Sequence, residues 1–145
     1  MSATPTTATT ATTATTAETI DAFVERLGAQ DADGLGELFA VEIDWVVPGD
    51  PSLPWVGQRS RKDDVPDYFR TLWAGLVPGK SAVSVRAVVT EGSEAVIFAA
   101  FDHVAAPTGR PFHTDVAMRF TVADGKIARL HLFEDTAAVA AAFAA

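Results

Sequence analysis

The sequence predicts an α+β fold in which a cone-shaped, curved antiparallel sheet wraps around three helices. The order of elements is the first reason: two helical patterns and a tryptophan-bearing strand precede a third helix, and four strands follow it. The second reason is Asp124-Gly125, which joins the last two strands and is a strong signal for a tight hairpin. Strands that follow one another form a meander with the helices on one side of it. A sheet curved in this way leaves a cavity beneath the helices.

Apolar residues recur at helical spacing in three stretches. Residues 20–27 form the first stripe, and residues 35–39 repeat the pattern in a shorter helix with Asp31 or Asp33 as its N-cap. The third stripe covers residues 64–76 and ends before a Pro-Gly pair. Each stripe gives its helix one apolar face, so all three helices can pack against a sheet.

Alternation of apolar and polar residues predicts the strands. Residues 41–47 alternate around Trp45 and form the first strand. Residues 48–55 contain three prolines and a glycine, which is typical of a shaped loop at the rim of a pocket. Asp135 predicts the N-cap of a last short helix. Four further strand candidates, separated by turn residues, follow the third helix: 81–90, 94–105, 111–122 and 126–134.

Composition limits the possible partners and compartments. The chain has 145 residues, of which 48% are apolar, and this is enough for one domain. We expect residues 1–17, a Thr/Ala-rich repeat, to be a disordered tail and residues 18–145 to form the single domain. A net charge of −8 disfavours nucleic acid as a partner, and no apolar stretch approaches the roughly 20 residues that cross a membrane. The absence of cysteine fits a cytoplasmic protein.

No motif for a metal or a cofactor is present in the sequence. The three histidines lack carboxylates at metal-binding spacing, and glycine-rich phosphate loops are absent. We therefore expect neither a metal nor a cofactor.

Several segments resemble a known superfamily. Leu38-Phe39-Ala40 precedes Trp45, residues 53–57 lead into the third helix, and residues 124–127 precede Asp135. From about Ala17 onward, this arrangement resembles the NTF2-like superfamily, in its SnoaL-like branch of polyketide cyclases related to ketosteroid isomerases. The resemblance implies the cone-shaped fold. It also implies a pocket for a hydrophobic small molecule and a homodimer formed through the outer face of the sheet.

Residues 107–110 and 125–128 are also similar to limonene-epoxide hydrolases. Those enzymes activate water with an arginine and a pair of aspartates. In an ungapped register, these three positions hold Ala99, Phe101 and Leu132, so we do not expect the hydrolase mechanism.

Ketosteroid isomerases need a base aspartate and an oxyanion hole of tyrosine and aspartate. The base falls near Val47 and the tyrosine near Phe23, whereas the single tyrosine, Tyr68, lies on the third helix. That mechanism does not map onto this chain either. The sequence therefore leaves open whether the protein is an enzyme.

Strand parity decides which polar residues share the pocket. On strand 94–105 both faces are mostly apolar, and the likeness to the hydrolases places Phe101 and His103 inward and Asp102 outward. His103 is then a candidate acid or base near the pocket mouth, although a half-solvated histidine at the end of a strand is an equally simple interpretation.

The same likeness places Glu134, at the end of strand 126–134, inside the pocket. A carboxyl group between apolar walls has a raised pKa, which suits proton transfer. Asp50 is a third catalytic candidate, because from the rim loop it can orient substrate or water. The alternative for Asp50 is an Asx turn set by its neighbours Gly49 and Pro51.

Large apolar residues supply the candidate walls for a ring-shaped ligand. Strand 111–122 adds the inward residues Thr114 and Val116, while its outward residues His113 and Asp115 become the leading dyad if the register is wrong. The other expected substrate-binding residues are Trp45, Trp55, Trp73, Phe101 and Leu132.

We therefore hypothesise a small pocket enzyme that moves protons without a cofactor on a hydrophobic cyclic or polyketide-like molecule. Cyclisation, isomerisation and dehydration all fit this chemistry. The alternative is a non-catalytic module of the same fold that binds a hydrophobic ligand or mediates dimerisation.

Overall fold

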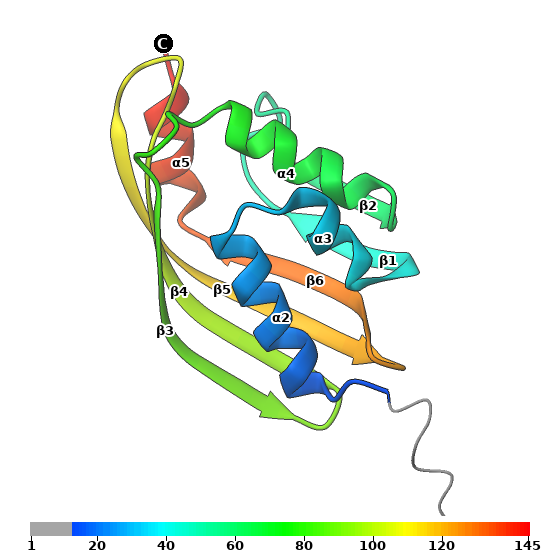
Figure 1. Cartoon of the computed structure of the whole chain (residues 1–145). Coiled ribbons are helices and arrows are strands. Elements are labelled where there is room, and N and C mark those ends of the chain that lie inside the picture. The colour runs from blue at the N-terminus through cyan, green and yellow to red at the C-terminus, as the bar shows by residue number, and fades with distance from the viewer. Residues whose placement is uncertain (1–12) are drawn as a thin grey trace, which may run out of the picture.

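The computed structural model describes residues 13–145, which form four helices and six strands (Figure 1). The elements in chain order are α2 (Thr16–Gly28), α3 (Ala32–Glu37), β1 (Phe39–Val47), β2 (Gly57–Arg61), α4 (Asp64–Ala74), β3 (Ala82–Glu91), β4 (Glu94–Val104), β5 (Pro111–Ala123), β6 (Lys126–Glu134) and α5 (Thr136–Phe143).

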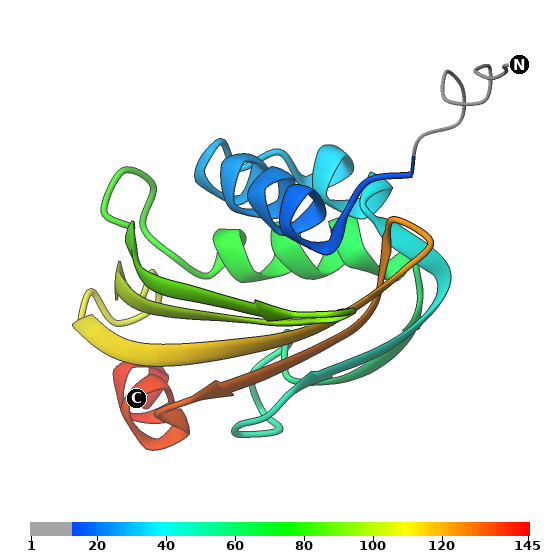
Figure 2. The same ribbon diagram turned by 90° about the horizontal axis from the view of Figure 1, so that it is seen from below.

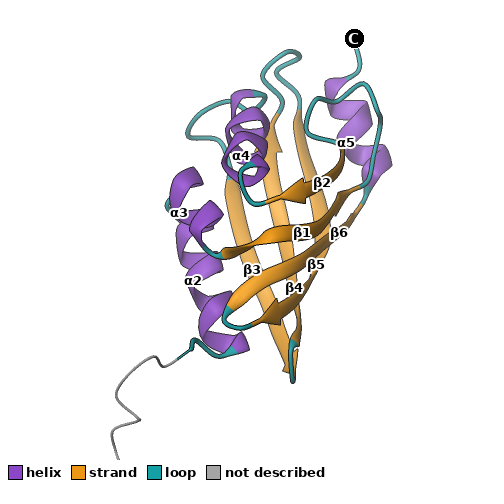
Figure 3. Ribbon diagram, turned by 90° about the vertical axis from the view of Figure 1, so that its right-hand side faces the viewer, coloured by secondary structure: helices purple, strands orange, loops and turns teal. Residues whose placement is uncertain are grey.

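The six strands form one curved, unclosed sheet in the order β2-β1-β6-β5-β4-β3 (Figure 3). All neighbours are antiparallel except β1 and β6, which run parallel. Helices α2, α3 and α4 lie together on one side of the sheet (Figure 2). The predicted α+β fold with a curved sheet around three helices is therefore confirmed, and the parallel β1–β6 pair is a detail that the sequence did not indicate.

The start of the folded domain differs from the expected boundary at residue 18. Thr15 is the N-cap of α2, where its hydroxyl accepts from the Glu18 N–H while the Glu18 carboxylate accepts from the Thr15 N–H. This reciprocal capping box satisfies two backbone donors and fixes the helix start at Thr16. The expectation of a disordered tail in residues 1–12 lies outside the described residues.

The second helix is shorter than the apolar spacing predicts. Asp31 caps α3 by accepting from the Gly34 N–H, and the helix ends at Glu37. Phe39 belongs to β1 and is buried there, so its apolar spacing reflects the strand rather than the helix. The third helix likewise ends at Ala74, two residues before the predicted end.

Strand β2 has no counterpart in the sequence prediction. Its five residues contain no large apolar side chain, and it lies at the edge of the sheet beside β1. An edge strand that buries little carries no alternating pattern, so periodicity cannot reveal it. The Asp124-Gly125 hairpin, by contrast, forms as expected, with positive φ angles of 51° and 74°.

The core lies between the sheet and the three helices. Phe23 of α2 is its centre and contacts the rings of Phe39, Phe69 and Phe120, at centroid distances of 6.5, 6.4 and 4.9 Å. Along β5, burial alternates from Thr114 to Val122, so the even-numbered residues face this core. Parity along the strands therefore follows the inward and outward assignment made from the sequence.

None of the helices in residues 13–145 combines the length and the apolar character needed to cross a membrane.

Candidate functional site

Two adjoining cavities lie between helix α4 and the inner face of the sheet. We call the first the inner chamber; it has an empty volume of about 410 Å³, part of it open to solvent. Of the residues that the structure describes, Tyr68 alone contributes a hydroxyl group to its wall. Trp45 belongs to this wall and is almost fully buried. The residues that line it are Phe23, Leu27, Trp45, Val47, Tyr68, Phe69, Leu72, Phe101, Met118, Leu130 and Leu132.

The second cavity, which we call the outer chamber, contains the ionisable groups. It has an empty volume of about 360 Å³ that also includes some open solvent, and it shares Tyr68, Leu72, Phe101 and Leu132 with the inner chamber. The residues that line it are Trp55, Tyr68, Leu72, Phe101, His103, Phe112, Thr114, Leu132, Glu134 and Val139.

Strand register brings His103 and Glu134 to the same chamber. Phe101 pairs with Thr114 across β4 and β5, and Val116 pairs with Glu134 across β5 and β6. Because side chains alternate along each strand, these positions and His103 all face inward. The structure thus places both polar candidates inside one cavity, together with Trp55 and Phe101.

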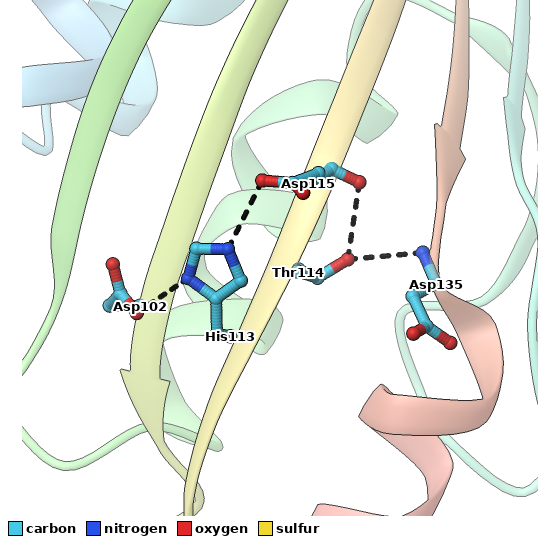
Figure 4. A network of polar contacts seen from close by, with 5 residues as sticks. All are labelled: Asp102, His113, Thr114, Asp115 and Asp135. Carbon is cyan, nitrogen blue, oxygen red and sulfur yellow. Dashed lines mark hydrogen bonds and ion pairs between the residues drawn. The ribbon is translucent and has the colours of Figure 1, made fainter.

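Thr114 holds the backbone next to Glu134. Its buried hydroxyl accepts from the Asp135 N–H at 3.0 Å and lies 3.4 Å from the Asp115 carbonyl, to which it donates (Figure 4). Asp135 in turn caps α5 by accepting from the Ala138 N–H, as the sequence predicts. These bonds fix the junction between β6 and α5, so Thr114 positions Glu134 in addition to lining the chamber.

Glu134 lies in surroundings that disfavour its charge. Burial and, after it, the neighbouring negative charge of Asp135 raise the pKa of its carboxyl from 4.5 to about 7. Within residues 13–145 its side chain makes no hydrogen bond or ion pair. At neutral pH this carboxyl group therefore exists in both protonation states, which is the condition that a proton-transfer group needs.

His103 is a neutral imidazole at the mouth of the same chamber. Burial lowers its pKa from 6.5 to about 4, and the nearby Asp102 charge opposes this effect only in part. Its Nδ1 atom lies 2.8 Å from the hydroxyl of Ser81, the residue that precedes β3. At neutral pH His103 can therefore donate or accept a hydrogen bond, but it carries no charge.

Tyr68 is a site residue that the sequence analysis did not assign. It lies on α4 and lines both chambers. Burial and, after it, the Glu134 charge raise the pKa of its hydroxyl, while the Arg59 guanidinium stands 4.8 Å from its ring centroid. Tyr68 follows Val65 by three residues and precedes Leu72 by four, so the apolar stripe of the helix contained the signal for its inward position.

Three of the predicted residues lie elsewhere. Asp50 is exposed and accepts from the Ser52 N–H, which is the Asx turn rather than a group in the cavity. Trp73 is half-buried and packs on Phe69 with 5.3 Å between ring centroids, outside the walls of both chambers. Val116 is buried in the core and also lines neither chamber. The sequence patterns of the loop, the helix and the strand identify candidate residues, but they do not show which side chains reach the cavity.

The alternative dyad lies on the outer face of the sheet. His113 is exposed there between two carboxylates, with Nδ1 2.8 Å from Asp102 Oδ1 and Nε2 3.1 Å from Asp115 Oδ1 (Figure 4). These hydrogen bonds raise the pKa of His113. The cluster therefore stabilises a charged imidazole on the surface and takes no part in the cavity.

In the part of the chain that the structure describes, no group of three or more His, Asp or Glu side chains could hold a metal ion.

Comparison with known proteins settles the family. A family model described as a SnoaL-like domain matches residues 20–130, which is most of the chain. The match covers the chamber walls from α2 to the middle of β6, while Leu132, Glu134 and Val139 lie just beyond it. The protein belongs to the SnoaL-like family. None of the proteins with curated functions matches this sequence.

Solved structures of SnoaL-like and NTF2-like proteins share this fold. An NTF2-like protein of unknown function from Burkholderia pseudomallei is 17% identical over 90% of this chain and 98% of its own, with a TM-score of 0.81. A putative SnoaL-like polyketide cyclase from Jannaschia is 21% identical over 90% of this chain and 92% of its own, with a TM-score of 0.75. TerC, co-crystallised with polyporic acid, is 20% identical over 88% of this chain and 96% of its own, with a TM-score of 0.76.

Proposed function

We propose that this SnoaL-like protein is a cofactor-free enzyme that moves protons on a hydrophobic, ring-containing molecule. The observation that carries this proposal is the pairing, in one apolar-walled chamber, of a carboxyl group with a pKa of about 7 and a neutral imidazole. The fold is also that of a protein named as a SnoaL-like polyketide cyclase and of TerC, which was crystallised with polyporic acid.

Glu134 is the proposed proton-transfer residue. Its ionised form takes a proton from a carbon next to a carbonyl group, and the electron pair moves onto the carbonyl oxygen to give an enolate. The neutral side chains of Tyr68 and His103 line the same chamber and supply hydrogen-bond donors for that oxygen. The protonated Glu134 then returns the proton to another carbon, which completes an isomerisation, or to the oxygen when a ring closes.

Deuterium exchange tests this step without the natural substrate. The probe is 2-tetralone, a flat apolar ketone with acidic C–H bonds, and NMR in D2O follows its exchange at neutral pH. Substitution Glu134→Gln keeps the shape and removes the base, so the catalysed exchange should fall by about 10²–10⁴-fold. His103→Gln should also slow exchange, while Glu91→Gln, on an exposed strand end, is the matched control. Equal exchange by wild type and Glu134→Gln would contradict the proposal.

A ligand-binding module is the second candidate. The inner chamber favours it, because its walls are apolar apart from the Trp45 indole nitrogen and the Tyr68 hydroxyl. Saturable binding of 2-tetralone together with exchange no faster than in buffer would support this second function.

We also propose a homodimer that forms through the outer face of the sheet. Phe98 and Phe133 are 44% and 56% exposed there, and they flank Ala117 in one row across β4, β5 and β6. Exposed aromatic rings in a row favour association with a second copy. Sedimentation at micromolar concentration tests it, and a monomer would contradict it. The cysteine-free composition fits the cytoplasm, which is the proposed location.

A further inference from the structure

Aromatic side chains form a continuous arc around the outer chamber. Centroid distances are 4.9 Å from Trp55 to Phe143, 5.7 Å from Phe143 to Phe112, 5.5 Å from Phe112 to His103 and 5.6 Å from His103 to Phe101. Four of these five rings line the chamber directly, while Phe143 packs behind Trp55 and Phe112. The arc draws on the loop before β2, on α5 and on strands β4 and β5, so it is built by the tertiary fold rather than by one segment.

One carboxyl group faces this arc without a counter-charge. Among residues 13–145, Glu134 is the only acidic residue that lines the outer chamber, and no lysine or arginine of this range lines it. The Arg59 guanidinium lies over the ring of Tyr68 and donates to the Trp55 carbonyl at 3.0 Å, so it braces the wall. The chamber thus combines π-electron-rich walls with an uncompensated carboxylate.

We propose that the ligand of the outer chamber carries a cationic nitrogen, a tertiary or quaternary ammonium group, which contacts the aromatic arc and pairs with Glu134. Aromatic faces attract cations through their quadrupole, and a desolvated carboxylate adds charge complementarity. The net charge of −8 also draws a cation toward the protein. This inference rests on the proposed function only in using the same chamber.

A cationic ligand would also prepare the proposed base. Before a ligand binds, the Glu134 carboxyl is about half protonated at pH 7, because its pKa is about 7. An adjacent ammonium group favours the ionised form, so binding expels the proton and leaves a carboxylate ready to accept one from the substrate. A substrate with both an ammonium group and an acidic C–H bond would therefore meet Glu134 in the ionised form, which can accept a proton.

The groups that face Glu134 change little between pH 6 and pH 8. Tyr68 on α4 stays neutral because its pKa is raised, and His103 on β4 stays neutral because its pKa is about 4. Asp135 is the neighbouring negative charge, whereas β5 and α5 contribute the uncharged Thr114 and Val139. A pH dependence of cation binding in this range therefore reports on Glu134.

Choline and its neutral isostere 3,3-dimethylbutan-1-ol are matched probes, because they differ in charge and little in shape. NMR titration of the ¹⁵N-labelled full chain measures both affinities at pH 6 and pH 8. Choline should perturb residues of the outer chamber and bind at least about tenfold more tightly than the alcohol at pH 8. Its affinity should rise by up to about tenfold from pH 6 to pH 8, while that of the alcohol stays constant.

Two variants separate the cation site from general hydrophobic binding. Glu134→Gln should abolish the pH dependence and most of the preference for choline, and Phe112→Leu should weaken choline more than the alcohol. Glu91→Gln removes one charge at an exposed strand end and should change neither affinity.

Equal affinity for the two probes, tighter binding of the alcohol, or no saturable choline binding would overturn the inference. So would a preference for choline that is undiminished in Glu134→Gln. None of these results bears on the 2-tetralone exchange, so the proposed cation site and the proposed proton transfer are tested independently.

Discussion

Replacing Glu134 by glutamine should remove a pH-dependent loss of stability. In the folded protein, burial holds the pKa of this carboxyl at about 7, whereas the unfolded chain has the ordinary value of 4.5. Between these two values the native state keeps its proton while the unfolded state releases one. The stability of the wild type therefore falls as pH rises from about 4.5 to about 7, and it stays lower at higher pH.

The two pKa values give the size of the effect. A difference of about 2.5 between them corresponds to about 3 kcal/mol at most, since each pKa unit is worth about 1.4 kcal/mol. Part of the loss is already present at pH 5, and solvent at the chamber mouth reduces it further. We therefore expect Glu134 to lower the unfolding free energy of the wild type by about 2 kcal/mol between pH 5 and pH 8.

Urea unfolding followed by tryptophan fluorescence measures this loss. The unfolding free energy is compared at pH 5 and pH 8 for the wild type, Glu134→Gln and the exposed control Glu91→Gln. The glutamine variant should lose about 2 kcal/mol less than the other two over this range. The same pH dependence in all three proteins would refute the claim that the chamber perturbs Glu134.

Three further perturbations follow from named contacts. His103→Gln should flatten the acid limb of the stability curve, because the lowered pKa of His103 makes the wild type lose stability as pH falls from about 6.5 through 4; an unchanged acid limb would contradict its burial. Gly75→Ala places a Cβ 2.8 Å from the Trp55 ring, so it should lower the unfolding free energy in urea by about 1–3 kcal/mol and shift the fluorescence of Trp55. An unchanged unfolding free energy would mean that the Trp55 ring moves aside. Thr15→Ala removes the α2 cap and should cost about 1 kcal/mol, and Thr15→Ser should restore most of it.

Much of the fold was predictable because its signals are local. The helical stripes, the alternation along the strands and the Asp124-Gly125 turn each report on a few consecutive residues, and the structure confirms all three. Strand β2 escaped prediction because it pairs at an edge without burying apolar side chains. The parallel contact of β1 with β6 escaped as well, since it joins segments more than eighty residues apart.

The site was harder to predict, because a cavity depends on where side chains end rather than on which face they share. Parity placed His103 and Glu134 inward, and both line the outer chamber. Parity also counted Val116, whose side chain fills the core. Trp73 was expected as a flat apolar wall, but it packs on Phe69 of its own helix. Tyr68 was not assigned to the site because the resemblance to ketosteroid isomerases places a tyrosine near Phe23. The spacing of Tyr68 from Val65 and Leu72 nevertheless predicts that its side chain lies on the inward face of the helix.

The electrostatics of the chamber also follow from what surrounds it. Hydrogen-bond donors and cations can outweigh burial and lower the pKa of a carboxyl group, as Thr121 and Arg119 do for Glu94 on the outer face. Glu134 has no such donors within residues 13–145, because the Thr114 hydroxyl donates to the Asp115 carbonyl and the neighbouring Asp135 N–H donates to the Thr114 oxygen. The bond that fixes the position of Glu134 thus also removes a donor from its surroundings. The same hydrogen bonds therefore fix the position of Glu134 and leave its carboxyl group with a raised pKa.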